Sequence, residues 1–146
     1  MDWLPALIAA VALPAGAAAI GLAWRARTGR VRAASDESAT MALGLDSDAL
    51  GSSATLVQFS TVYCSRCPST ARQLAAISAD YPGVRHVEVD LTGRPDLADR
   101  FHVLQTPTTL ILDARGATTA RIGGVPRVHD LRDRLDILTG RSHVTS

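Results

Sequence analysis

The feature that most constrains this chain is an unbroken apolar run near its start. Every position from Trp3 to Trp24 is uncharged, and Ala, Leu, Ile and Val dominate the run. As a helix, a run of this length extends about 33 Å, enough to cover the roughly 30 Å hydrocarbon layer of a bilayer. Trp3 and Trp24 stand at its two ends, where amphipathic rings prefer the headgroup level. We therefore predict a transmembrane anchor over residues 1–24.

A cleaved signal peptide is the main alternative for this run. Residues 15–17, Ala-Gly-Ala, resemble a cleavage site. However, the segment before the run is Met1-Asp2 and carries no basic side chain, and the run is longer than a signal peptide's usual apolar region. These two features favour a permanent anchor.

The charges that follow the run predict its orientation. Arg25, Arg27, Arg30 and Arg32 come first, and an acidic stretch rich in Ser and Ala follows. We predict a basic juxtamembrane segment and polar linker over residues 25–46. Because juxtamembrane Arg is retained on the cytoplasmic side, the chain is expected to cross the cell membrane once, with its C-terminal part on the cytoplasmic face.

The remaining residues, 47–146, are enough for one folded domain. Their pattern alternates short β-rich runs with helical spacing, in the order β-α-β-α-β-β-α. A helical crossover makes the first two strands parallel, and a tight turn makes the last two antiparallel. We therefore predict an α/β domain with a four-stranded mixed sheet and helices on both faces. Its expected elements are strands 55–59, 84–90, 108–113 and 119–123, and helices at 65–79, 95–101 and after Pro126.

The two cysteines of the chain lie together in "LVQFSTVYCSRCPSTARQL", where a strand runs into a helix. Residues three apart in a helical turn have Cβ atoms about 5–6 Å apart or slightly closer, near the range that a disulfide spans. Cys64 is expected at the helix N-terminus, where unpaired N–H groups favour a thiolate, and Arg66 adds a cation. This placement predicts a redox pair, with Cys64 as nucleophile and Cys67 as resolving thiol.

Functions of the pair other than exchange chemistry have less support in the sequence. A metal site would need two more ligands, and His86, His102, His129 and His143 are not at metal-ligand spacing. We expect these histidines to be solvated or capping residues, and we expect no metal or other cofactor. A purely structural disulfide would close too short a loop to add much constraint. The net charge of +1 offers no electrostatic footprint for nucleic acid, so no nucleic-acid partner is expected.

Four segments, in order, resemble the thioredoxin superfamily over roughly residues 47–140. They are "LVQFSTVYCSRC", "VEVD" ending at Asp90, "VLQTPTTLILD" and "RIGG". The resemblance implies a thioredoxin-like fold and thiol–disulfide exchange with protein disulfide or dithiol substrates. It also implies a reductase that donates electrons to the pair.

The resemblance assigns roles to individual residues of this chain. Cys64 is the attacking thiol, and Cys67 resolves the mixed disulfide. The other matched positions bind substrate: Pro107 is the cis-proline that faces the pair, the Thr106 backbone hydrogen-bonds an extended strand, and Tyr63 and Gly123 line an apolar groove.

Three departures from the family pattern affect the tuning of the pair. Gln58 occupies the position of a buried carboxylate that helps deprotonate the resolving cysteine. The dipeptide Ser65-Arg66 replaces the usual Gly-Pro, a main determinant of the reduction potential. Pro68 follows Cys67 and favours a helix that begins late.

Together these observations predict a membrane-tethered thiol–disulfide oxidoreductase that works through a Cys-Ser-Arg-Cys pair. A cytoplasmic domain lies where thiols are kept reduced, which favours a reductase over a disulfide-forming oxidant. The alternative is a non-catalytic protein that uses a thioredoxin-like fold to bind a metal or a partner.

Overall fold

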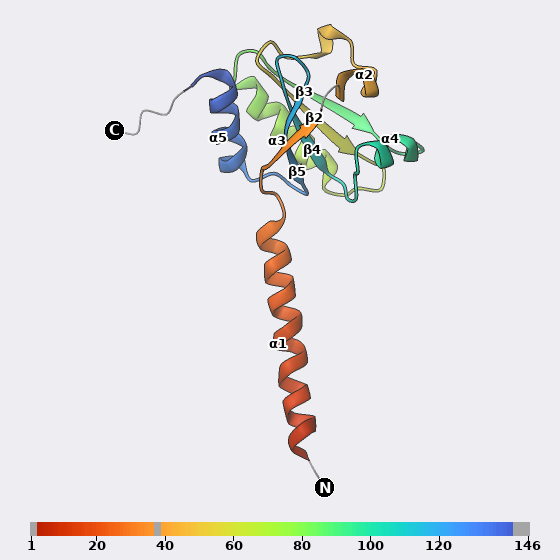
Figure 1. Ribbon diagram of the computed structural model, residues 1–146, viewed down its shortest axis with the longest axis vertical. Coiled ribbons are helices and arrows are strands. Elements are labelled where there is room, and N and C mark those ends of the chain that lie inside the picture. Colours follow the sequence, from red (N-terminus) through yellow and green to blue (C-terminus); the bar gives the residue numbers. More distant parts are fainter. Residues whose placement is uncertain (1–2, 37–38, 142–146) are drawn as a thin grey trace, which may run out of the picture.

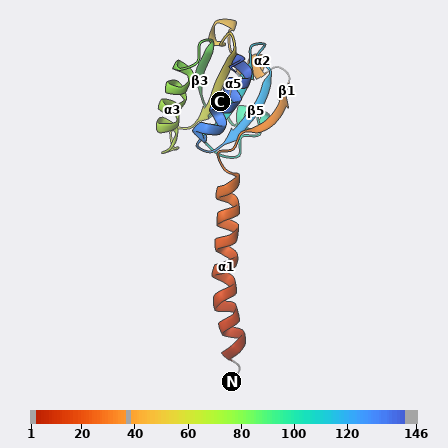
Figure 2. The ribbon, with the colours of Figure 1, turned by 90° about the vertical axis from the view of Figure 1, so that its left-hand side faces the viewer.

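The computed structural model describes residues 3–36 and 39–141. The first element, α1 (Trp3–Arg27), has no buried residue and projects from one end of the domain (Figure 1, Figure 2). Its length and its mean hydropathy of 2.1 are sufficient for a membrane crossing. A signal sequence near an N-terminus meets the same criterion.

The four predicted strands form the expected mixed sheet. Strand β2 (Ala54–Ser60) pairs in parallel with β3 (Val84–Asp90) and antiparallel with β4 (Thr108–Asp113). Strand β5 (Thr118–Gly123) pairs antiparallel with β4. A helical crossover joins β2 to β3 and a tight turn joins β4 to β5, which confirms the predicted connections.

A fifth strand lies within the segment that the sequence presents as a linker. Strand β1 (Arg32–Asp36) pairs antiparallel with β5, so the sheet order is β1-β5-β4-β2-β3. The segment 25–46 therefore contributes ordered structure, including the short helix α2 (Ala39–Leu43). The physical reason is that β5 would otherwise be an edge strand with unpaired backbone groups, and β1 covers them.

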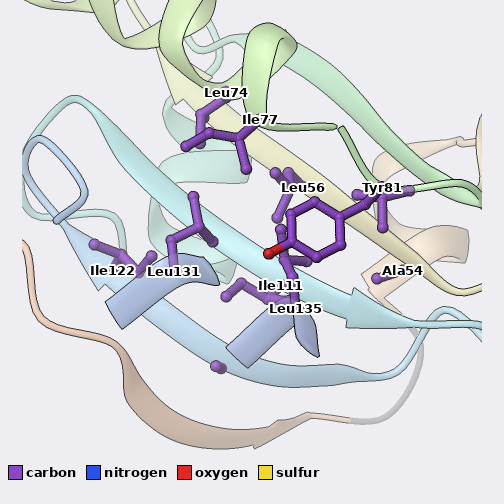
Figure 3. Packing of buried hydrophobic residues seen from close by; sticks show 11 residues of the cluster. Ala54, Leu56, Leu74, Ile77, Tyr81, Ile111, Ile122, Leu131 and Leu135 are labelled. Atoms are coloured by element: carbon purple, nitrogen blue, oxygen red, sulfur yellow. The ribbon is translucent and has the colours of Figure 1, made fainter. Parts of the chain in front are cut away.

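Helices cover both faces of the sheet. Helices α3 (Cys67–Ala79) and α5 (Val128–Thr139) pack on one face, where Figure 3 shows Leu74 and Leu131 directed toward Leu56. Helices α2 and α4 (Pro95–Arg100) pack on the other face, around Phe59. Because successive residues of a strand point to opposite faces, β2 is buried on both sides along its whole length.

Helix α3 begins at Cys67, two residues later than its predicted start at 65. Pro68 explains the difference. Proline fits the first turn of a helix, where its missing N–H group would have had no partner, and it does not fit further inside. At the other end of the helix, Gly83 adopts a φ of 80° and turns the chain into β3.

Candidate active site

Cys64 and Cys67 form a disulfide bond, with their Cα atoms 5.4 Å apart. Cys64 lies in the turn before α3 and is partly exposed, whereas Cys67 is the first residue of the helix and is only 2% exposed. Cys64 thus stands ahead of the helix rather than inside its first turn. The difference in exposure makes the Cys64 sulfur the one that a partner can reach.

The sheet register brings the other predicted site residues to the same end of the domain. Phe59, near the end of β2, pairs with Thr108 at the start of β4, and Thr108 pairs with Gly123 at the end of β5. The Thr106–Pro107 peptide bond just before β4 is cis. Arg66 and these two residues line a common hollow of about 380 Å³. The turn that contains the cysteines therefore lies beside the cis-proline loop.

The backbone of this loop is partly available to a ligand. The Pro107 carbonyl accepts a hydrogen bond from the Gly124 N–H at 2.8 Å, but the Thr106 backbone bonds to no residue that the structure describes. Gly123 lines a separate groove of about 700 Å³, together with Leu104 and Gln105. Tyr63 is 88% exposed and lines neither hollow. Tyr63 and Gly123, which were expected to line one groove, therefore do not line a common one.

Gln58 is fully buried and connects the resolving cysteine to a histidine. Its Nε2 donates a hydrogen bond to the Cys67 carbonyl at 3.1 Å. Its Oε1 lies 3.1 Å from the His86 Nε2 on β3. Since the amide nitrogen already faces Cys67, the amide oxygen accepts, and the His86 N–H donates to it. Both polar ends of this buried amide are thereby satisfied.

His86 was expected to be a solvated or capping residue, and this expectation is wrong. The side chain is half-buried, and burial lowers the pKa of His86, against the opposing charge of Glu88. The contact between His86 and Gln58 follows from the alternation of side chains along each strand. Val84 and His86 point to the α3 face of β3, as Leu56 and Gln58 do on β2. This contact can be predicted only once the parallel pairing of β2 with β3 is known.

Metal binding has no site among the residues that the structure describes: none of them form a group of three or more His, Cys, Asp or Glu suited to an ion. His143 lies outside these residues.

The geometry agrees with the comparison to known sequences. The thioredoxin family model matches residues 46–136, which is more than half of the chain. The chain belongs to the thioredoxin family. A disulfide-bonded pair at the family's active-site position makes it a thiol–disulfide oxidoreductase. The matched range begins after α1, β1 and α2, so these elements lie outside the part of the chain that the family model matches.

Individual thioredoxins support this assignment. A thioredoxin of Mycolicibacterium smegmatis is 38% identical over 97 residues, which cover 62% of this chain and 86% of that protein. Thioredoxin H5 of Oryza sativa subsp. japonica is 28% identical over 83 residues, covering 57% of this chain and 60% of that protein. The crystal structure of a Nicotiana alata thioredoxin superposes with a TM-score of 0.52 at 26% identity, over 60% of this chain and 75% of that one.

Gln58→Asp is expected to raise the rate of disulfide exchange, with some loss of stability of the reduced domain. A carboxylate at this position can accept a proton from Cys67, and general-base catalysis of this kind contributes about 100-fold or more. We expect the exchange rate near pH 7 to rise at least about tenfold, which is a tenth of the lower end of that range. The desolvation penalty of the buried carboxylate is about 1–3 kcal/mol. Stopped-flow exchange with a small disulfide, across pH 6 to 9, measures the rate.

Gln58→Asn is the matched control for this prediction. Asn has the length of Asp but no proton-accepting carboxylate, so a change in shape alone would affect both variants equally. A rate for Gln58→Asp that stays within a factor of about two of the Gln58→Asn rate at every pH would show that proton transfer at position 58 does not limit exchange.

Proposed function

We propose that this protein is a membrane-tethered disulfide reductase, held by α1 with its redox domain on the cytoplasmic face. The observation that carries the exchange chemistry is the pairing of a partly exposed Cys64 with a buried Cys67 at the start of α3. A long apolar helix that buries nothing in the domain supports the tether. The Arg residues directly after the apolar run support the cytoplasmic side.

The proposed reaction begins with both cysteines reduced. The Cys64 thiolate attacks one sulfur of a substrate disulfide, forms a mixed disulfide and releases the other sulfur as a thiolate. Cys67 then attacks the Cys64 sulfur, which releases the second substrate thiol and closes the Cys64–Cys67 disulfide. Two electrons pass to the substrate, and a donor dithiol reductase returns the pair to its reduced form.

The surrounding residues are assigned supporting roles in this proposal. The Thr106 backbone, which bonds to no residue that the structure describes, would hydrogen-bond an extended substrate segment next to the cis-proline, Pro107. Tyr63 and Gly123 would contact its side chains. Ser65 and Arg66, between the cysteines, would tune the reduction potential, and Gln58 would hold the carbonyl of the resolving cysteine.

The sidedness of the membrane tests this proposal, because a cytoplasmic domain favours a reductase. We expect a single engineered cysteine, Ile137→Cys in a Cys64→Ser, Cys67→Ser background, to resist a membrane-impermeant thiol reagent in intact cells. Ile137 is well exposed on α5, so the same cysteine should react fully after lysis. Full labelling before lysis would overturn the cytoplasmic assignment and the reductase with it.

A fractionation control completes the test of the tether. The full chain should sediment with membranes and resist extraction by alkaline carbonate, as a helix that crosses the bilayer does. A chain that appears in the soluble fraction, shortened near residues 15–17, would show that the apolar run is a signal peptide.

A further inference from the structure

The cysteine pair and α1 lie at the same end of the domain. The Gly29 N–H donates a hydrogen bond to the Gly123 carbonyl at 2.8 Å, and the Arg127 N–H donates to the Gly29 carbonyl at 3.1 Å. Gly123 is paired with Thr108, directly after the cis-proline. The chain leaving α1 is therefore bonded to the edge of the sheet that carries the redox site.

The connection between α1 and the domain is short and well bonded. Helix α1 ends at Arg27, and β1 begins at Arg32. The Arg127 side chain donates hydrogen bonds to the carbonyls of Arg25 and Ala26, at 3.3 and 3.1 Å. A flexible tether would let the domain turn in any direction, whereas these contacts hold its redox end toward α1.

Residues of the apolar run take part in lining the redox site. Gly21 and Trp24 line the same 380 Å³ hollow as Arg66, Thr106 and Pro107. The neighbouring 700 Å³ groove lies between the last turns of α1 and the loop that contains Leu104. The end of a membrane span is where hydrocarbon gives way to headgroups. With α1 across the bilayer, the cis-proline loop thus lies at headgroup depth.

The exposed side chains at this end suit such a position. Leu104 is 95% exposed, Tyr63 is 88% exposed and Val62 is 70% exposed, and all three flank the redox site. Arg25 and Arg66 line the hollow beside them. Apolar and aromatic groups next to arginines match the boundary between hydrocarbon and anionic headgroups.

The opposite end of the domain faces away from α1. The Arg132 side chain, on α5, bonds to Asp80 at 2.6 Å, just after the end of α3. That end also holds the starts of β2 and β3, where Ala54 pairs with Val84. A substrate that approached from bulk water would meet this end first, and it holds neither cysteine.

We propose that the physiological substrate is a disulfide held at the membrane surface by an integral membrane protein, within the headgroup layer on the side of the redox domain. This inference rests on the proposed membrane tether and reductase chemistry. The reduced Cys64–Cys67 pair gives two electrons to that disulfide and becomes oxidised, while the partner's two sulfurs leave as thiols. Placement at headgroup depth selects the substrate by its distance from the bilayer.

A spectroscopic experiment tests the placement without any redox chemistry. Nitroxide labels are attached to Leu104→Cys or Ile137→Cys, each in a full-length Cys64→Ser, Cys67→Ser chain reconstituted in vesicles of phosphatidylcholine with a minority of phosphatidylglycerol. Both positions are exposed and apolar. Leu104 lines the groove beside α1, whereas Ile137 is in the last turn of α5, near Arg141, whose side chain bonds to Asp80 at the opposite end of the domain. We expect a headgroup-anchored nickel chelate to relax the label at 104 strongly and the label at 137 weakly. Equal relaxation at both positions would overturn the placement.

A kinetic experiment tests the substrate class with the wild-type chain in the same vesicles. The probes are two single-span Leu/Ala-rich peptides with the same small disulfide loop. One peptide carries the loop directly after its span, and the other carries it beyond a proline-rich spacer of about ten residues, which extends about 30 Å. We expect the reduced protein to reduce the surface-proximal loop at least about tenfold faster, since confinement to a common layer raises the effective concentration.

A spacer variant supplies the matched control. The same proline-rich spacer, inserted between Arg27 and Thr28, lifts the domain from the bilayer and should reverse the preference between the two peptides. Reduction of soluble insulin by both chains separates the possible failures. If both chains reduce insulin while the two peptides react equally, the substrate class is wrong and the reductase stands. If neither chain reduces insulin, the reductase proposal fails, and this inference fails with it.

Discussion

Cys67→Ser is expected to accumulate covalent mixed disulfides with partner proteins, whereas Cys64→Ser accumulates almost none. The exposed Cys64 can still attack a partner when Cys67 is absent, but nothing then resolves the adduct. With Cys64 absent, the remaining Cys67 sulfur is buried at the start of α3. We expect at least about tenfold more adduct from the first variant, because exchange depends on access to the attacking thiolate.

Non-reducing electrophoresis after an acid quench measures the adducts of both variants. The double variant, Cys64→Ser with Cys67→Ser, supplies the background, and reduction with dithiothreitol should remove every adduct band. Similar amounts of adduct from the two single variants would contradict the assignment of Cys64 as the attacking thiol.

Phe59→Ala is expected to destabilise the domain by about 3–5 kcal/mol, a large part of the 5–15 kcal/mol that holds a typical domain together. The Phe59 side chain is fully buried, and its ring centroid lies 5.4 Å from that of Phe101. Truncation removes apolar contact between β2 and the segment that follows α4, and it leaves a cavity in that core. Because β2 leads directly into the cysteine turn, loosening of this core should also disturb the redox site.

Denaturant unfolding of the full chain in mild detergent, followed by circular dichroism, measures this loss of stability. Leu104→Ala is the control, since Leu104 is almost fully exposed and its truncation should change the free energy of unfolding by less than about 0.5 kcal/mol. A loss below about 1 kcal/mol for Phe59→Ala would show that this core contributes little to stability.

Much of the domain could be predicted from local patterns. The strands over residues 84–90 and 108–113 have the predicted bounds, and α4 differs from its predicted range by one residue. Gly or Pro stands at or near the ends of these segments, so local signals and tertiary packing agree. Strand β1 is different, because its residues show no strand pattern of their own and are ordered by pairing with β5.

In the candidate site too, some features follow from local sequence and others depend on tertiary contacts. Cys64, Cys67 and Pro107 lie in motifs that can be recognised within the sequence, and the structure gathers their segments at one end of the sheet. The contact between Gln58 and His86 joins positions on different strands and depends on their parallel register. The bonding of α1 to the redox end depends on how β5 and the following loop present Gly123 and Arg127. Such contacts form between segments that are far apart in the sequence, so local patterns do not predict them.

The measurement that tests the central claim most directly is the reduction potential of the Cys64–Cys67 pair in the full chain. The protein is equilibrated in glutathione buffers of graded ratio, trapped by acid, and scored for free thiols. The account predicts a reversible two-electron transition with a midpoint below about −200 mV, because reductases of this kind lie at about −200 to −270 mV and a strong disulfide-forming oxidant lies near −120 mV. A midpoint above about −200 mV, or a pair that does not titrate reversibly, would contradict the assignment of this protein as a reductase.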